Sequence, residues 1–427
     1  MIKKTFFGLI KPRLECEPIE SSLSKAENIL PSKKITLLLN NPTEPKAAVL
    51  LKERDNVKTG QKISLSKDSN EYVISTVTGN VSSISHFTGY LGKPYTSITI
   101  NIADNELLDE EFKNHCKEPT LDASVNFLNF IPGSPPFNLF ADPDVSIKNI
   151  IVCGFDTDLL VKTNQYIMKS NLDLIKTGIR ILKKITGVEN IILAVPQNLV
   201  SEANETDATV KTIKSEYPGT LYPMVMRNVL GFSLLAGRNF EDSGVCFFTA
   251  EAVASMGYAF SEGRIPMMKT LTLIKKDGSK KLVSAKIGTA VSEILKANSI
   301  SLNEKDRLIF GGPMQGVSIY SEEQCVQPDT DAVLVQDRDD LSHISDYPCI
   351  NCGECIRICP ANIPVNLLVR FLESGLYEEG ADHYGLLSCI ECGLCSYVCV
   401  SRIPIMQYIK LAKYELDRTK KVEAANV

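Results

Sequence analysis

Eight cysteines near the C-terminus repeat one spacing twice. Each run follows C-x2-C-x2-C-x3-C, and the second run starts 40 positions after the first. The first run is Cys349, Cys352, Cys355 and Cys359, and the second is Cys389, Cys392, Cys395 and Cys399. Runs with this spacing bind [4Fe–4S] clusters, with three thiolates on a tight loop and the fourth ligating the other cluster. The sequence therefore predicts two [4Fe–4S] clusters and the transfer of single electrons.

Crossed ligation divides the eight thiolates into two sets of four. The first cluster takes Cys349, Cys352, Cys355 and Cys399, and the second takes Cys389, Cys392, Cys395 and Cys359. Zinc is one alternative, but a tetrahedral site needs only four thiolates, and each run alone supplies that number. Disulfides are another alternative, and cysteines about three residues apart fit disulfide geometry poorly.

The two runs belong to a longer duplication. Residues 349–365 read CINCGECIRICPANIPV and residues 389–405 read CIECGLCSYVCVSRIPI, so 8 of the 17 paired positions are identical. The shared glycines Gly353 and Gly393 allow backbone N–H groups to approach cluster sulfurs. Val400 replaces Pro360 in the second run, but this position is not a ligand, so we expect cluster binding to survive.

The composition is ordinary for a soluble globular protein. The 427 residues are enough for two to four domains, and a formal net charge of −5 gives no support for a nucleic-acid partner. No window of 18 apolar residues predicts a membrane span, and Phe6–Ile10 is too short for a signal segment or anchor. Cluster thiolates without an export signal indicate the cytoplasm. The other five cysteines are expected to be small buried apolar residues; they are Cys16, Cys116, Cys153, Cys246 and Cys325.

The first third of the chain reads as short alternating strands. Residues 35–105 resemble a barrel-sandwich module of the lipoyl carrier type, with two strands expected around Thr78-Gly79-Asn80. The carrier lysine is missing from that hairpin, so the module is expected to have a structural role. Residues 130–145 contain four prolines and predict a linker or ordered wrap rather than a helix or strand.

Alternating strand and helix patterns follow. Two buried strands, at 148–155 and 188–197, flank an amphipathic helix within 158–186 and predict a βαβ unit. A helix is expected at 251–263, and then two strands around Asp277-Gly278 with a further helix suggest a β-grasp-like module. The region from about 345 looks helical, and a tail helix at 405–419 is expected to pack on the cluster domain.

This order resembles the C subunit of the Rnf ion-translocating electron-transport complex over roughly residues 1–415. Phe6–Pro12 is similar to the family's opening F-x-G-G-[IV]-H-P, and Gly311–Gly316 is similar to its GGPMMG turn. The resemblance implies a multidomain α/β plus α fold. Its expected parts are a barrel-sandwich hybrid (1–110), a linker or wrap (111–146), a Rossmann-like domain (147–265), an SLBB-like β-grasp module (266–335) and a twin-cluster helical ferredoxin domain (340–427).

The chain departs from the family at its flavin and nucleotide motifs. A glycine-rich GxGGAxFPTH loop becomes Phe130–Phe137 with three prolines, which remove N–H donors. The family's NGVECEPY becomes Cys153–Leu160, and its YPxGGEKQL becomes Tyr217–Pro223 without the second glycine and charged pair. The resemblance thus implies at most a vestigial or weak FMN and NADH site, formed by Gly154, Asp156 and Asp158. We expect no FMN and no independent NADH dehydrogenase activity.

The resemblance implies an electron-transfer iron–sulfur subunit of a membrane-associated Rnf-type complex. The chain would be peripheral on the cytoplasmic side of the cell membrane. Its partners would be membrane-embedded and iron–sulfur subunits, with ferredoxin as a further candidate. One alternative is an FMN-dependent subunit that oxidises NADH, and another is a soluble corrinoid or microcompartment reductase of similar architecture.

Overall fold

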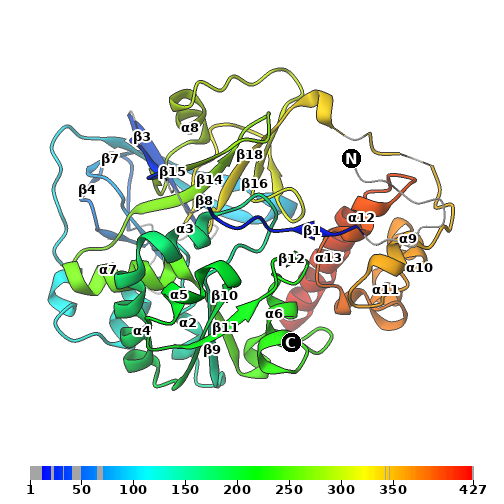
Figure 1. Cartoon of the computed structure of the whole chain (residues 1–427). Coiled ribbons are helices and arrows are strands. Elements are labelled where there is room, and N and C mark those ends of the chain that lie inside the picture. The colour runs from blue at the N-terminus through cyan, green and yellow to red at the C-terminus, as the bar shows by residue number, and fades with distance from the viewer. Residues whose placement is uncertain are drawn as a thin grey trace.

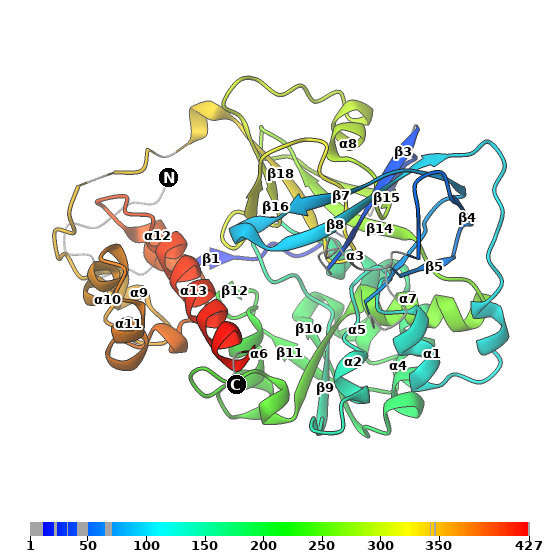
Figure 2. The ribbon, with the colours of Figure 1, turned by 180° about the vertical axis from the view of Figure 1, so that it is seen from behind.

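The computed structural model describes residues 12–20, 24–31, 33–40, 50–64, 71–341, 343–345 and 347–425. Residues 6–11 of the opening motif lie outside this set. Three regions that contain β-sheets pack together, and a helical region lies at one end of the molecule (Figure 1). The reverse view shows the same division, with the long C-terminal helix between the helical region and the rest (Figure 2).

The first region is a small antiparallel structure with its own core. Strand alternation turns Ile35, Leu37 and Leu39 inward, where they are almost fully buried with Ile98 and Ile100. One sheet has the strand order β3-β8-β7-β4, and a second pairs β5 with β6. The strands are β3 (Lys34–Leu39), β4 (Asn56–Val57), β5 (Lys62–Ile63), β6 (Val73–Ile74), β7 (Gly79–Thr88) and β8 (Pro94–Ile102).

Gly79 does not form the hairpin turn that the sequence predicts. The change of direction occurs before it, and Gly79 starts β7, paired with Ile102 of β8. A Cβ at this position would lie 1.9 Å from the carbonyl oxygen of Asn101, so only glycine allows the two strands to approach this closely. Thr78 is buried and its hydroxyl bonds to Thr59, so the segment is part of the core and not an exposed arm.

The proline-rich segment is folded into the core of the next domain. It contains one short helix, α2 (Asn138–Ala141), so the prediction of neither helix nor strand at 130–145 is wrong at those four residues. Leu128, Ile131 and Phe137 are fully buried in the main apolar core, whose contacts lie too far away in sequence for local patterns to reveal. Two short helices precede the segment, η2 (Phe112–His115) and α1 (Leu121–Phe127).

The second region is a parallel α/β domain with the strand order β11-β10-β9-β13. Ile150 and Val152 of β9 face a core with α4 and α7, whereas Ile151 and Cys153 face α6 on the other side. The strands are β9 (Asn149–Cys153), β10 (Asn190–Pro196), β11 (Thr209–Ile213) and β13 (Val245–Thr249). The helices are α3 (Thr163–Ser170), α4 (Leu172–Thr186), α5 (Val200–Ala203), α6 (Tyr222–Leu230) and α7 (Ala250–Glu262).

The third region is a mixed sheet with the order β17-β16-β18-β14-β15-β2. Strands β14 and β15 form the hairpin expected around Asp277-Gly278, and β18 runs parallel to β14. Helix α8 (Val291–Ala297) contributes to the core of this sheet. The strands are β2 (Glu27–Ile29), β14 (Met268–Ile274), β15 (Lys280–Lys286), β16 (Arg307–Phe310), β17 (Val317–Ile319) and β18 (Ala332–Gln336).

A buried charge cluster joins the mixed sheet to the α/β domain. Lys269 of β14 has no exposed side-chain surface, and its ammonium contacts the carboxylates of Glu251 on α7 and Asp331. Burial opposes the charge on Lys269, but the two carboxylates outweigh it and raise the pKa of this lysine. Burial also raises the pKa of Glu251 to about 7. Lys269 therefore keeps its positive charge, and this charge must be paired with the carboxylates for the mixed sheet to pack on the α/β domain.

Replacing Lys269 by alanine should destabilise the fold strongly. The change leaves Glu251 and Asp331 without their buried cation, and breaking a buried ion pair costs about 3–5 kcal/mol. The control is Lys183→Ala, which removes an exposed pair with Glu189 and should cost about 0–1 kcal/mol. Urea unfolding followed by circular dichroism measures both, and equal midpoints for the two variants would contradict the expectation.

The C-terminal region is helical, and α13 (Ile405–Ala425) packs along it. Ile405, Ile409 and Ala412 of α13 are buried against the other helices, as expected of a tail helix that packs on its own domain. The other helices are α9 (Glu354–Ile358), α10 (Val365–Glu373), α11 (Tyr377–His383), η6 (Leu386–Ser388) and α12 (Leu394–Val398). In the part of the chain that is described, no helix is long and apolar enough to cross a membrane.

Candidate metal centres

The eight cysteines of the two runs line two small cavities. The first cavity is lined by Cys349, Cys352, Cys355 and Cys399, and the second by Cys359, Cys389, Cys392 and Cys395. The two cavities are equally small, with volumes of about 20 Å³ each. Each takes three cysteines from one run and one from the other, which is the grouping that crossed ligation requires.

The duplicated sequence produces a duplicated backbone around these cavities. Asn351 and Glu391 both have left-handed backbone conformations, with φ of 59° and 55°. Gly353 and Gly393 follow at φ of 75° and 72° and start the single-turn helices α9 and α12. A loop curled in this way turns three thiols toward one point, and the helix then carries the fourth cysteine away to the neighbouring cavity.

The thiols are not gathered as they would be around a single metal ion. Among the residues described, no three His, Cys, Asp or Glu side chains lie close enough together to hold one metal ion. A zinc ion has Zn–S bonds of about 2.3 Å and would draw its thiolates together. All 13 cysteines are free thiols, so the structure gives no support to the disulfide alternative.

The two cavities differ in their surroundings. Near the first, Cys352 is exposed and Tyr347 and Ile350 have 79% and 66% of their surface exposed. The second lies against the α/β domain, where the Tyr217 hydroxyl donates to the Cys392 carbonyl over 2.6 Å. The Gln315 amide likewise donates to the carbonyl of Glu391. The first cavity therefore faces the outside, and the second faces the body of the protein.

Backbone and lysine groups supply positive potential at the cavities. The N–H groups of Glu391 and Ile403 donate to the sulfurs of Cys389 and Cys399, each over 3.4 Å. Lys413 of α13 donates to the Cys389 carbonyl over 2.7 Å and pairs with Glu391 over 2.8 Å. Hydrogen bonds and charge near cluster sulfurs adjust reduction potential, so Lys413 distinguishes the second cavity from the first.

The residues expected to form a vestigial flavin site make internal contacts instead. The Asp156 carboxylate accepts hydrogen bonds from the Asn164 and Gln165 backbones at the start of α3, and burial raises its pKa to about 6. Gly154 packs so closely that a Cβ would lie 2.7 Å from Met168. The acid and the glycine are therefore engaged in holding strand β9 against α3.

Asp158 holds the glycine turn of the mixed sheet. Its carboxylate accepts from the backbone N–H groups of Leu159, Met314 and Gln315, at 2.7–3.2 Å. Burial raises the pKa of this carboxyl, although these donors act in the opposite direction. The turn at 311–316 thus packs on the loop that follows the carboxyl end of β9, and ligands bind beyond such strand ends in open α/β sheets.

The proline-bearing loop at 130–137 lies against the start of α7, just after the carboxyl end of β13. Gly133 has φ of 89°, and a Cβ there would lie 2.3 Å from the backbone nitrogen of Ala252 in α7. Thr249 caps α7 by accepting from Ala252, and its hydroxyl donates to the Gly133 carbonyl. The N-terminus of α7 is therefore capped by Thr249 and in contact with the proline-bearing loop.

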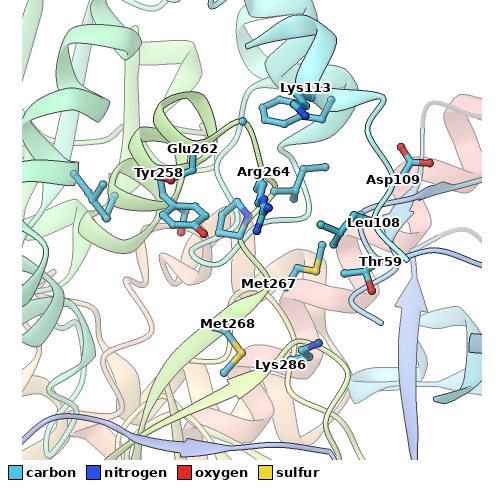
Figure 3. Close-up of a pocket in the computed structure, with 18 of the residues that line it drawn as sticks. Thr59, Leu108, Asp109, Lys113, Tyr258, Glu262, Arg264, Met267, Met268 and Lys286 are labelled. Carbon is cyan, nitrogen blue, oxygen red and sulfur yellow. The ribbon is translucent and has the colours of Figure 1, made fainter. Parts of the chain in front are cut away.

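A separate cavity of about 710 Å³ lies between the first region, α7 and β14 (Figure 3). Tyr258, Arg264 and Met268 lie around it, together with the acidic residues Asp109 and Glu262. The whole lining has five acidic and three basic side chains, which is a small acidic excess. None of the residues that line it belongs to the cysteine runs or to the expected flavin site, so we assign it no role.

Two lysines with a role in the structure were not predicted from the sequence. Lys269 stands inside the apolar strand run MKTLTLI, and a lysine at such a place signals a buried charge. Lys413 gives no comparable signal, because its position beside the second cavity depends on how α13 packs. The remaining five cysteines behave largely as expected, with four buried and Cys116 partly buried.

Three family models match separate parts of the chain. The RnfC barrel sandwich hybrid domain matches residues 6–106, the NqrA second alpha/beta domain matches 132–265, and the 4Fe-4S dicluster domain matches 341–400. The C subunit of the proton-translocating ferredoxin:NAD(+) oxidoreductase complex of Clostridium ljungdahlii is 27% identical over 282 residues. The chain is RnfC-like. The predictions of an N-terminal barrel-sandwich domain and of a C-terminal domain for iron–sulfur clusters are confirmed.

The match between the RnfC-like chain and its relatives is partial. It covers 64% of this chain and 62% of the Clostridium protein. The C subunit of the ion-translocating oxidoreductase complex of Rhodobacter capsulatus is 26% identical, over 60% of this chain and 51% of that protein. The chain thus matches about half to two thirds of the length of these relatives. A solved NAD+-reducing [NiFe]-hydrogenase covers 74% of this chain and 69% of its own at 11% identity, but its TM-score of 0.46 is too low to support an argument.

Proposed function

We propose that this chain is an electron-transfer iron–sulfur subunit of a membrane-associated, Rnf-type ion-translocating oxidoreductase complex. It would pass single electrons through two [4Fe–4S] clusters. The observation that carries the proposal is the grouping of eight cysteines into two cavities with four thiols each. The relatives named as the C subunits of such complexes support the assignment to a complex. The eight cysteines would be the ligands, in the crossed sets given by the two cavities.

Electrons would move between two clusters that lie close together. Cys355 of α9 lines the first cavity, and Cys359, which directly follows the helix, lines the second. Four residues span at most about 14 Å even in an extended chain, so the clusters would be close neighbours. The first cluster would face partner subunits through the exposed residues around Tyr347 and Ile350. Attachment to the cytoplasmic face of the membrane would come through those partners.

The remaining regions would serve as scaffold. We propose domain limits of 1–110, 111–146, 147–265, 266–335 and 340–427, with the fourth unit an SLBB-like β-grasp. The order β15-β14-β18-β16, crossed by one helix, supports that unit. The internal contacts of Asp156, Asp158 and Gly133 support a scaffold role for the α/β domain rather than a flavin site.

Iron and sulfide analysis tests the two-cluster proposal. Protein purified without oxygen should contain about eight iron and eight sulfide per chain. Its absorbance should show the broad charge-transfer band of [4Fe–4S] clusters, and dithionite should bleach it. Stoichiometric zinc without visible absorbance would overturn the proposal, and about four iron would leave only one of the two cavities as a cluster site.

Replacing Lys413 by methionine should lower the reduction potential of the second cluster. Reduction adds negative charge to a cluster, and Lys413 places a positive charge beside Cys389. We expect a decrease on the order of 50 mV, measured by redox titration with EPR detection. The control is Arg418→Met on the same helix, whose guanidinium pairs with Glu415 at the surface. A shift shared by both variants, or by neither, would contradict a local effect of Lys413.

A further inference from the structure

A cleft of about 440 Å³ opens beside the second cysteine cavity. Its walls come from α6, the loop 231–239 and α13, which lie next to one another in both views (Figures 1 and 2). Pro360 and Ala361, which follow Cys359, lie at the base, and so do Leu387 to Ile390 around Cys389. The two segments that carry half of the second set of thiols are thus reached from this cleft.

The cleft has an excess of positive charge. Arg227, Arg238 and Lys420 line it, and all three are exposed. Within the described part of the chain, none of these three side chains makes an ion pair or hydrogen bond. Lys413 also lines the cleft but is paired with Glu391, and Asp417 is the single acid. This local excess contrasts with the net charge of −5 for the whole chain.

Exposed apolar side chains surround these cations. Leu235, on the loop that forms one wall, has 71% of its surface exposed, and Phe232 on the same loop has 42%. Apolar and arginine side chains together at a surface are typical of protein–protein contacts, and a small anion would leave the apolar rim in water. The combination therefore favours a protein occupant that carries acidic groups.

We propose that this cleft docks an acidic one-electron carrier protein, which exchanges its electron with the second cluster. The inference rests on the proposed function, since it requires a cluster in the second cavity. In the exchange the carrier loses one electron and is oxidised, and the [4Fe–4S]2+ cluster gains that electron and becomes [4Fe–4S]1+. The cations attract the acidic carrier, and docking brings its redox centre beside the Cys359 and Cys389 segments. Complementary charge of this kind mainly accelerates association and makes it sensitive to salt.

The test measures how fast a reduced bacterial two-cluster ferredoxin, an acidic carrier, bleaches the cluster absorbance of the full-length protein. The site variant carries Arg227→Gln, Arg238→Gln and Lys420→Gln together. The matched control carries Lys58→Gln, Lys184→Gln and Arg307→Gln, which remove the same charge from exposed positions elsewhere. We expect the second-order rate constant of the site variant to fall roughly tenfold at low salt and to lose most of its salt dependence. The control should stay within about twofold of the unchanged protein.

Two checks distinguish a failure of the docking proposal from a failure of the proposed electron-transfer function. Each variant must retain about eight iron and be fully reduced by dithionite, since otherwise the clusters themselves are at fault. With intact clusters, equal rates for the site variant and the control overturn the docking proposal and leave the proposed function standing. Reduced FMN serves as a small anionic donor. If the site variant slows reduction by FMN as much as reduction by ferredoxin, the cleft attracts small anions and the protein-docking proposal fails.

Discussion

The Cys359→Ala variant should lose the second cluster and keep the first. Cys359 belongs to the first run in sequence, but its side chain lines the cavity shared by Cys389, Cys392 and Cys395. Removing one of four ligands should lower the iron content by up to about four atoms per chain. The EPR spectrum of the reduced variant should therefore resemble that of Cys389→Ala.

The reciprocal change provides the matched comparison. The single variants Cys399→Ala and Cys349→Ala should each remove the first cluster, because both side chains line the first cavity. Cys116→Ala is the control, since this thiol lies outside both cavities and bonds to the Phe112 carbonyl. If Cys359→Ala instead gave the spectrum of Cys349→Ala, each cluster would take all four ligands from a single run, and the crossed assignment would be wrong.

NADH alone should not reduce the clusters, and the purified protein should contain no FMN. The places where a phosphate would bind are taken up by the protein itself. Asp158 accepts hydrogen bonds from Met314 and Gln315, and Gly133 lies against the first turn of α7. A flavin phosphate needs free N–H donors, and these contacts leave few at this edge of the sheet.

Two measurements check this expectation. Fluorescence of the supernatant after acid precipitation detects any released flavin, and anaerobic addition of NADH followed at the cluster absorbance detects electron entry. Dithionite is the positive control, because it should bleach the same sample completely. Bound FMN, or bleaching by NADH within minutes, would sink the scaffold role of the α/β domain and favour the NADH-oxidising alternative.

The elements with strong local patterns could be predicted from the sequence. The helix expected at 251–263 is α7 (Ala250–Glu262), and the strands expected around Asp277-Gly278 are β14 and β15. The cluster sites could be predicted from the spacing of the cysteines alone, because a [4Fe–4S] cluster requires ligands at these intervals. The amphipathic tail was also recognisable, because its apolar stripe has helical period.

What the sequence could not provide depends on contacts between distant residues. Gly79 looked like a turn glycine, yet its role comes from the close approach of Asn101. Asp158 looked like part of a ligand site, yet its partners are 156 and 157 positions further along the chain. The segment at 130–145, with its four prolines, was expected to be a linker or an ordered wrap, and the sequence did not show that its apolar side chains complete a core built from later strands. Local periodicity carries no information about such pairings.

The crossed thiol sets have a mechanical consequence for the helical region. A cluster held by both runs is a cross-link between the two halves of the duplication, and the second cluster, which would hold both Cys359 and Cys389, closes the 29 residues between them into a ring. Metal loading and folding then become one process, because the unloaded chain lacks these ties. Loss of the second cluster would open this ring, whereas loss of the first would leave it closed. Proteases should therefore cut α10 and α11 once the second cluster is lost.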